Sequence, residues 1–197
     1  MTPVPVAAWL DPSCPWAWQT MVWLRDLRDQ GEVALSYRLF ALELNAAEPE
    51  HTFAEANPRY GVAMTSLALA LREGDDRFEA LYVALGRRLH EQRRPISRTV
   101  LAEAAAEGHA AVAVADASLE DDVVGAYRDA RARDVFGVPT LQVADDKVRY
   151  GPILAVGPTG SEGLALWRHV RALADDGTFF ELKRWPRDLR PGGAPVG

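Results

Sequence analysis

The stretch WLDPSCPWAW, residues 9–18, decides the fold and holds Cys14, the only cysteine of the chain. Before it, the apolar residues 4–10 predict a short buried strand that ends at the breaker Asp11-Pro12. Helical spacing follows, so Cys14 is expected at a helix N-terminus, where unpaired N–H groups and the helix dipole favour a negative sulfur. Such thiols can have a pKa as low as roughly 3.5–7.5. We therefore expect a reactive, largely ionised thiol at neutral pH; the alternative is a small buried hydrophobe, the commoner fate of a lone cysteine.

The composition restricts the kind of protein. A chain of 197 residues that is 48% hydrophobic can bury a substantial core, which predicts one domain with elaborations. The net charge of −6 argues against nucleic acid and anionic membrane surfaces as partners. One cysteine cannot form an intrachain disulfide or a cysteine-rich zinc site, so no metal is expected. No signal-peptide pattern and no apolar stretch of about 18 residues is visible, which predicts a cytoplasmic protein without a membrane span.

The periodicity changes twice along the chain. Residues 33–39 alternate between apolar and other side chains, which predicts a second strand. Residues 45–134 then show only helical signals, including an expected capping box formed by Ser118 and Asp121. This middle part of the chain is therefore predicted to be a block of helices.

The strand pattern returns after the helical block. Residues 141–143 and 148–150, with the turn Asp145-Asp146 between them, predict a β-hairpin, and Thr159 with Glu162 is expected to cap a final helix. This order predicts an α/β fold, a thioredoxin fold with an all-helical insertion. The expected parts are a thioredoxin-like core of residues 1–44 and 135–180, a helical insert of residues 45–134 and a loose C-terminal tail of residues 181–197.

A second motif, Val138-Pro139-Thr140, opens the hairpin. A proline that comes shortly after a glycine, here Gly137, and directly before a strand can mark a cis peptide bond. An ordinary trans proline that starts an edge strand is the commoner case. A cysteine at a helix start and a Pro-Thr at this strand occur together in the thioredoxin fold, where the proline packs beside the sulfur. We therefore expect Pro139 to be cis and to contact Cys14.

These motifs together resemble the DsbA-like branch of the thioredoxin superfamily. Within that branch the chain is most similar to the FrnE-like proteins and the mycothiol-dependent nitroreductases. The likeness spans nearly the whole chain and rests on Asp11-Pro12-Ser13-Cys14-Pro15-Trp16, Gly86-Arg87-Arg88-Leu89-His90, Val138-Pro139-Thr140, Tyr150-Gly151-Pro152-Ile153-Leu154 and Phe179-Phe180-Glu181-Leu182-Lys183-Arg184.

The resemblance implies roles for particular residues. Cys14 would be the nucleophile and Trp16 the aromatic wall beside it. Asn45, Tyr60 and His90 would hold a low-molecular-weight thiol, mycothiol or glutathione, or the substrate. The backbone of Val138, next to Pro139, would pair with the bound thiol compound.

Each of these residues also has a purely structural interpretation. Trp16 would be core or rim packing, Asn45 a strand end or helix cap, and Tyr60 loop packing. His90 would be a satisfied histidine at the edge of the core. The basic residues Arg87-Arg88 and Arg93-Arg94 are expected to form a solvated helix face or to attract an acidic thiol.

The chain departs from its relatives at one position. They typically have C-P-W-C, whereas this sequence has Cys14-Pro15-Trp16-Ala17, so no second thiol is present to release a mixed disulfide. The leading hypothesis is a monothiol oxidoreductase in which a second small thiol resolves the mixed disulfide. An alternative is a thiol-dependent transferase or isomerase, similar to kappa-class glutathione transferases and 2-hydroxychromene-2-carboxylate isomerases, with Cys14 favoured over Ser13 as the activating group. The third is a non-catalytic ligand-binding protein. The sequence leaves the substrate, the choice of thiol and a homodimer open.

Overall fold

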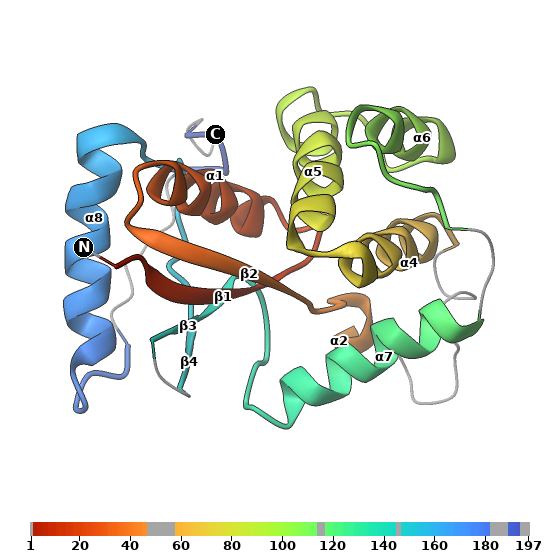
Figure 1. Ribbon diagram of the computed structural model, residues 1–197. Helices are drawn as coiled ribbons and strands as arrows, with labels where there is room; N and C mark the ends of the chain where they lie inside the picture. Colours follow the sequence, from red (N-terminus) through yellow and green to blue (C-terminus); the bar gives the residue numbers. More distant parts are fainter. Residues whose placement is uncertain (1, 47–57, 114–116, 145–146, 182–188, 194–197) are drawn as a thin grey trace.

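The computed structural model describes residues 2–46, 58–113, 117–144, 147–181 and 189–193, and these contain a four-stranded sheet in the order β2-β1-β3-β4 (Figure 1). β1 (Val4–Leu10) pairs in parallel with β2 (Val33–Leu39) and antiparallel with β3 (Thr140–Val143), which pairs antiparallel with β4 (Val148–Tyr150). The predicted strands are therefore present, and the expected hairpin turn at residues 145–146 lies outside the described residues.

Helix α1 (Pro15–Asp29) connects the two parallel strands and packs against α8 (Gly160–Asp175). Its buried residues include Met21, Leu24 and Leu27, which recur on one face at helical spacing. The Trp23 indole meets Trp167 of α8 edge-on and donates a hydrogen bond of 2.9 Å to the carbonyl oxygen of Gly163. Cys14 therefore lies at the start of a helix that is firmly packed against the rest of the fold.

The helical part between β2 and β3 lies beside one end of the sheet (Figure 1). It consists, in the described residues, of α2 (Glu43–Ala46), α4 (Pro58–Glu73), α5 (Asp75–Gly86), a π-helix (Arg87–Glu91), α6 (Arg98–Glu107) and α7 (Ala117–Arg131). The predicted fold class, a thioredoxin fold with a helical insertion, is confirmed. The exact boundaries of the core, the insert and the tail stay a prediction. Helices α4, α5 and α7 of the predicted insert all pack on β2, which belongs to the predicted core.

Trp18 joins α1 to the helical part. Its indole is 2% exposed and lies so close to Gly86 that a Cβ on that glycine would come within 2.3 Å of a ring carbon. The ring also contacts Tyr82 and His90. Only a residue without a side chain fits at position 86, so this contact fixes how closely α5 approaches α1.

A buried carboxylate makes a second connection. Glu79 of α5 is 8% exposed and accepts hydrogen bonds from the Nε of Arg25 at 2.8 Å, from Arg28 and from the hydroxyl of Tyr37. These ionised and hydroxyl partners lower the pKa of Glu79 against the opposing effect of burial. The cluster ties α1 and β2 to α5.

Some sequence-based details differ from the structure. The expected capping box at Ser118 is wrong, because α7 already begins at Ala117 and the Ser118 carbonyl and hydroxyl accept hydrogen bonds from Arg72. Thr159 is the N-cap residue of α8 but its side chain makes no capping hydrogen bond. Within the part of the chain that is described, none of the helices is both long and apolar enough to cross a membrane.

Candidate active site

Cys14 lies where the sequence predicts it, at the N-cap of α1. It has extended backbone angles, and its sulfur accepts a hydrogen bond from the backbone N–H of Ala17 at 3.4 Å. Pro15 occupies the first helical position, where no N–H partner is needed. The thiol is 7% exposed and lies 3.7 Å from the carbonyl oxygen of Val138, to which it donates. The sulfur therefore sits between helix N–H groups on one side and a carbonyl on the other.

The surroundings of Cys14 act against the expected ionisation. Burial raises the pKa of Cys14 above its ordinary value, and the nearby charge of Asp11 acts in the same direction. The backbone N–H groups of Ala17 and Trp16 lower the pKa but do not outweigh the loss of hydration. The surroundings of Cys14 therefore favour the protonated thiol over the thiolate.

The loop before β3 approaches the thiol through its backbone. The Val138–Pro139 peptide bond is cis, and the Pro139 carbonyl accepts a hydrogen bond from the N–H of Gly151 at 2.8 Å. The hydroxyl of Thr140 donates to the Gly137 carbonyl at 2.7 Å. The Val138 carbonyl is thereby left directed at Cys14.

Asp11 is the buried polar centre of the turn that leads to Cys14. Its carboxylate is fully buried and accepts hydrogen bonds from the N–H and hydroxyl of Ser13, the N–H of Leu42 and the hydroxyl of Tyr60. Burial nevertheless raises the pKa of Asp11. The Ser13 hydroxyl, considered as an alternative activating group, is occupied by this carboxylate at 2.6 Å.

Tyr60 was expected in the pocket, and the structure directs its hydroxyl inward. The side chain is 1% exposed, and it bonds the Asp11 carboxylate from α4. Burial and the adjacent carboxylate raise the pKa of Tyr60. The residue therefore braces the turn before Cys14 across the boundary between sheet and helical block.

His90 reaches the same turn from the π-helix. Its Nε2 lies 2.9 Å from the Pro12 carbonyl oxygen, which can only accept, so Nε2 has the proton in this tautomer. The imidazole stacks on Trp18 with ring centroids 6.2 Å apart. Burial lowers the pKa of His90, which keeps the ring neutral.

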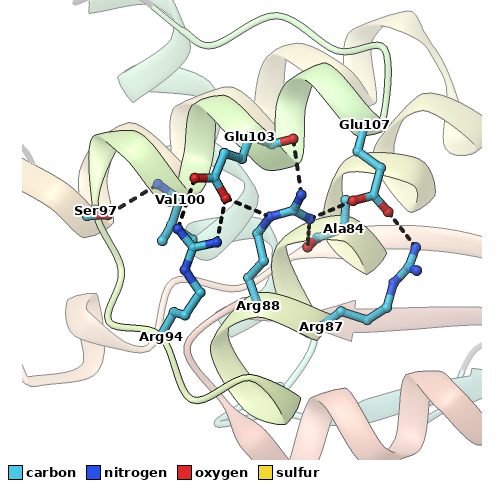
Figure 2. A network of polar contacts seen from close by, with 8 residues as sticks. All are labelled: Ala84, Arg87, Arg88, Arg94, Ser97, Val100, Glu103 and Glu107. Carbon is cyan, nitrogen blue, oxygen red and sulfur yellow. Dashed lines mark hydrogen bonds and ion pairs between the residues drawn. The ribbon is translucent and has the colours of Figure 1, made fainter.

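An ion-pair network holds the π-helix against α6 (Figure 2). Arg88, whose side chain is 13% exposed, donates to the Ala84 carbonyl and to Glu107, each at 2.8 Å or less. Arg87 pairs with the same Glu107, and Arg94 pairs with Glu103. Arg87, Arg88 and Arg94 of the basic run thus have acidic partners, and the network supports the turn that presents His90.

The other two predicted residues lie nearby. Trp16 is half-buried in the first turn of α1, packed on the edge of the core. Asn45 is exposed; its Nδ2 donates to the Phe136 carbonyl at 3.0 Å, and its Oδ1 accepts from Tyr127 at 2.9 Å.

Tyr60 and His90 thus contact the turn at 11–14, Asn45 contacts the loop at 136–139, and the Val138 carbonyl of that loop is hydrogen-bonded to the sulfur. Asp11, Tyr82 and Trp18 were not expected in the site. Tyr82 donates to the Asp11 carbonyl at 3.3 Å, and the buried Nε1 of Trp18 has no hydrogen-bond partner among the residues that the structure describes. The sequence indicated that Asp11 ends the first strand, but it did not indicate the hydrogen-bond partners of Asp11, which come from distant elements.

The fold and the position of Cys14 together place the chain among proteins with a thioredoxin fold that has a helical insertion. The family model of the Rv2466c-like proteins, described as mycothiol-dependent nitroreductase Rv2466c, matches residues 13–184, and the chain belongs to this family. The family resemblance stated from the sequence is confirmed.

Individual relatives agree with this placement. The chain is 32% identical over 183 residues to the Mycobacterium tuberculosis protein named Uncharacterized protein Rv2286c, covering 88% of this chain and 79% of the relative. The cytosolic disulfide reductase DsbM of Pseudomonas aeruginosa has a similar fold, with a TM-score of 0.57, 16% identity, and 85% and 99% of the two chains covered. A periplasmic thioredoxin-like protein of Salmonella enterica serovar Typhimurium gives a TM-score of 0.57 at 16% identity, with 88% and 83% covered.

Proposed function

We propose that the protein is a cytoplasmic monothiol oxidoreductase in which Cys14 exchanges with a low-molecular-weight thiol, mycothiol or glutathione. The observation that supports this best is the placement of the only cysteine. Its sulfur lies at a helix N-terminus beside the Val138 carbonyl, in a member of a mycothiol-dependent family. Pseudomonas aeruginosa DsbM, which shares the fold, has a structure with GSH. The sequence contains no second cysteine that could release a mixed disulfide.

The proposed chemistry uses the single thiol of Cys14. The Cys14 thiolate attacks one sulfur of a substrate disulfide, forms a mixed disulfide and releases the other half as a thiolate. A small-molecule thiolate then attacks the mixed disulfide, leaves with the bound half and regenerates the Cys14 thiolate. These two steps exchange one half of the substrate disulfide for one small thiol. A second small thiolate then attacks the resulting mixed product and releases the remaining substrate half as a thiolate, so two small thiols together supply two electrons and end as their own disulfide.

Because the thiolate is the attacking species, the proton of Cys14 must pass to solvent before the attack, against surroundings that favour the thiol. The N–H groups of Ala17 and Trp16 already face the sulfur and stabilise the anion once it forms. Trp16, Asn45 and the Val138 backbone are proposed to contact the bound thiol. The proposed roles of Tyr60 and His90 are to hold the turn that presents the sulfur.

Turnover of bis(2-hydroxyethyl) disulfide, with mycothiol or glutathione as the sole reductant, tests this proposal. The wild type should accelerate thiol consumption, and Cys14→Ser should not. Ser13→Ala is the matched control, since that hydroxyl faces Asp11 and not the reacting sulfur. Equal rates for wild type and Cys14→Ser would remove disulfide exchange as the function.

The protonated thiol favours a second candidate. A buried S–H that donates to an acceptor can equally donate to the thiolate of a bound small thiol, which is how a transferase or isomerase would use it. In that mechanism Cys14 never forms a disulfide, and Cys14→Ser keeps a donor at the site. Retained affinity for the small thiol with conjugation or isomerisation in Cys14→Ser would support this candidate. Retained affinity with no turnover in any variant would indicate a binding protein.

A further inference from the structure

The loop beside the thiol is held by hydrogen bonds to its backbone carbonyl groups. From Val135 to Pro139 every backbone carbonyl has a partner. The partners are, in order, the Arg131 guanidinium, the Asn45 amide, the Thr140 hydroxyl, the Cys14 thiol and the Gly151 N–H. The position of the Val138 carbonyl, which faces the sulfur, is therefore set by its neighbours.

One of these partners reaches the loop from α2. The Nδ2 of Asn45 donates to the Phe136 carbonyl at 3.0 Å. Since a carbonyl cannot donate, the amide nitrogen must face the loop, and the amide oxygen must face the other way. The oxygen accepts a hydrogen bond of 2.9 Å from the hydroxyl of Tyr127.

Tyr127 is itself firmly placed. It lies on α7, and its ring packs on the fully buried Phe40, which follows β2, with centroids 5.2 Å apart. The hydroxyl therefore projects from a fixed ring toward an exposed amide. An exposed asparagine without this contact would sample several rotamers, and its hold on the loop would weaken accordingly.

We infer that Tyr127 is a positioning residue for the thiol site: through Asn45 it fixes the loop at 136–139 and hence the carbonyl that faces Cys14. The inference rests on the proposed function only in taking Cys14 as the reacting atom. Asn45 would then link Tyr127 to the loop, and its amide would keep one N–H and one lone pair for a ligand.

Removing the Tyr127 hydroxyl should change the sulfur in a defined direction. A carbonyl oxygen beside the sulfur stabilises the protonated thiol, and a closed loop excludes water; both effects oppose ionisation. A loosened loop should thus favour the thiolate. One hydrogen bond of this kind corresponds to about a threefold to tenfold change in an equilibrium.

The experiment is the rate of Cys14 alkylation by iodoacetamide against pH, which needs no small thiol, no substrate and no turnover. It compares Tyr127→Phe, Asn45→Ala and the double variant with the wild type. Tyr37→Phe is the control. It also removes one tyrosine hydroxyl from a hydrogen bond, but the partner of that hydroxyl is Glu79 in the ion-pair cluster and not a residue of the thiol site. Thermal unfolding of each variant separates loss of stability from a local effect.

Tyr127→Phe and Asn45→Ala should each speed alkylation at neutral pH by about threefold to tenfold, with a midpoint shifted to lower pH. The double variant should add little to either single change, because both act through one contact. Tyr37→Phe should leave the profile unchanged. A wild-type profile in Tyr127→Phe, or fully additive effects in the double variant, overturns the inference. Failure of the proposed function would appear instead as absent disulfide exchange in the wild type.

Discussion

Replacing Gly86 by alanine tests how the helical part is held on α1. A Cβ at this position would lie 2.3 Å and 2.4 Å from two ring carbons of Trp18. Carbon atoms in contact prefer about 3.5–4.0 Å, so one partner must move by roughly 1 Å or more. Trp18 is 2% exposed and stacked with Tyr82 and His90, so it has little room to move.

The expected cost follows from two opposed effects. Overpacking of a tight interface costs about 1–3 kcal/mol, and this overlap belongs at the upper end. Alanine is a better helix former than glycine by about 1 kcal/mol. The net loss for Gly86→Ala is therefore about 2 kcal/mol, which corresponds to a fall in Tm of roughly 4–8 °C for a chain of this size.

Gly125→Ala is the matched control. Gly125 lies inside α7, and a Cβ there meets no atom within 4 Å. This variant should gain about 0.5–1 kcal/mol from helix propensity alone. The assay is thermal unfolding by circular dichroism, with the His90 ring signals in NMR as a local probe. A Gly86→Ala protein as stable as Gly125→Ala would refute the close approach of Trp18 to α5.

Three further changes have defined outcomes. Glu79→Gln should destabilise the protein above about pH 4.5, and the difference from wild type should vanish on acidification, because a carboxylate with a lowered folded-state pKa stabilises only while it is ionised. Denaturant unfolding at several pH values measures this, and a difference that does not change with pH would contradict it. Asp11→Asn should lower the pKa of Cys14, since the Asp11 charge raises it, and should cost about 1–3 kcal/mol because either amide orientation points an NH₂ group at a backbone N–H. Alkylation against pH and unfolding give the two readouts; an unshifted alkylation midpoint would be inconsistent with the charge effect. Ala17→Cys should form an internal disulfide with Cys14, gain insulin reduction and lose part of its small-thiol exchange, because position 17 already contacts the sulfur. Free-thiol titration and turnover measure this; full native turnover despite the disulfide would place the mixed disulfide off the pathway.

Local patterns predicted much of the fold. The strand before Asp11, the helix start at Cys14 and the motif at Val138-Pro139 all depend on neighbouring residues, and each lies where the sequence placed it. The Ser118 capping box failed because a short motif also occurs inside helices. The π-helix is not visible to a 3.6-residue period, although it presents His90.

The site was harder to predict because its properties depend on tertiary burial. The helix start favours a thiolate at Cys14, but the loop and the helical part remove water and reverse the shift in its pKa. The role of Asp11 as the polar centre of the turn depends on the fold, which brings the Leu42 N–H and the Tyr60 hydroxyl to its carboxylate. Tyr127 belongs to no motif at all, and its role depends on where α7 crosses the end of β2.

Intact-mass spectrometry shows whether Cys14 alone exchanges with a small thiol. Wild type and Cys14→Ser are incubated with mycothiol disulfide or glutathione disulfide, and each is then treated with the free thiol. The wild type should gain the mass of one thiol moiety, free thiol should remove it, and Cys14→Ser should gain nothing. A wild-type mass that stays unchanged with both disulfides would rule out exchange at Cys14.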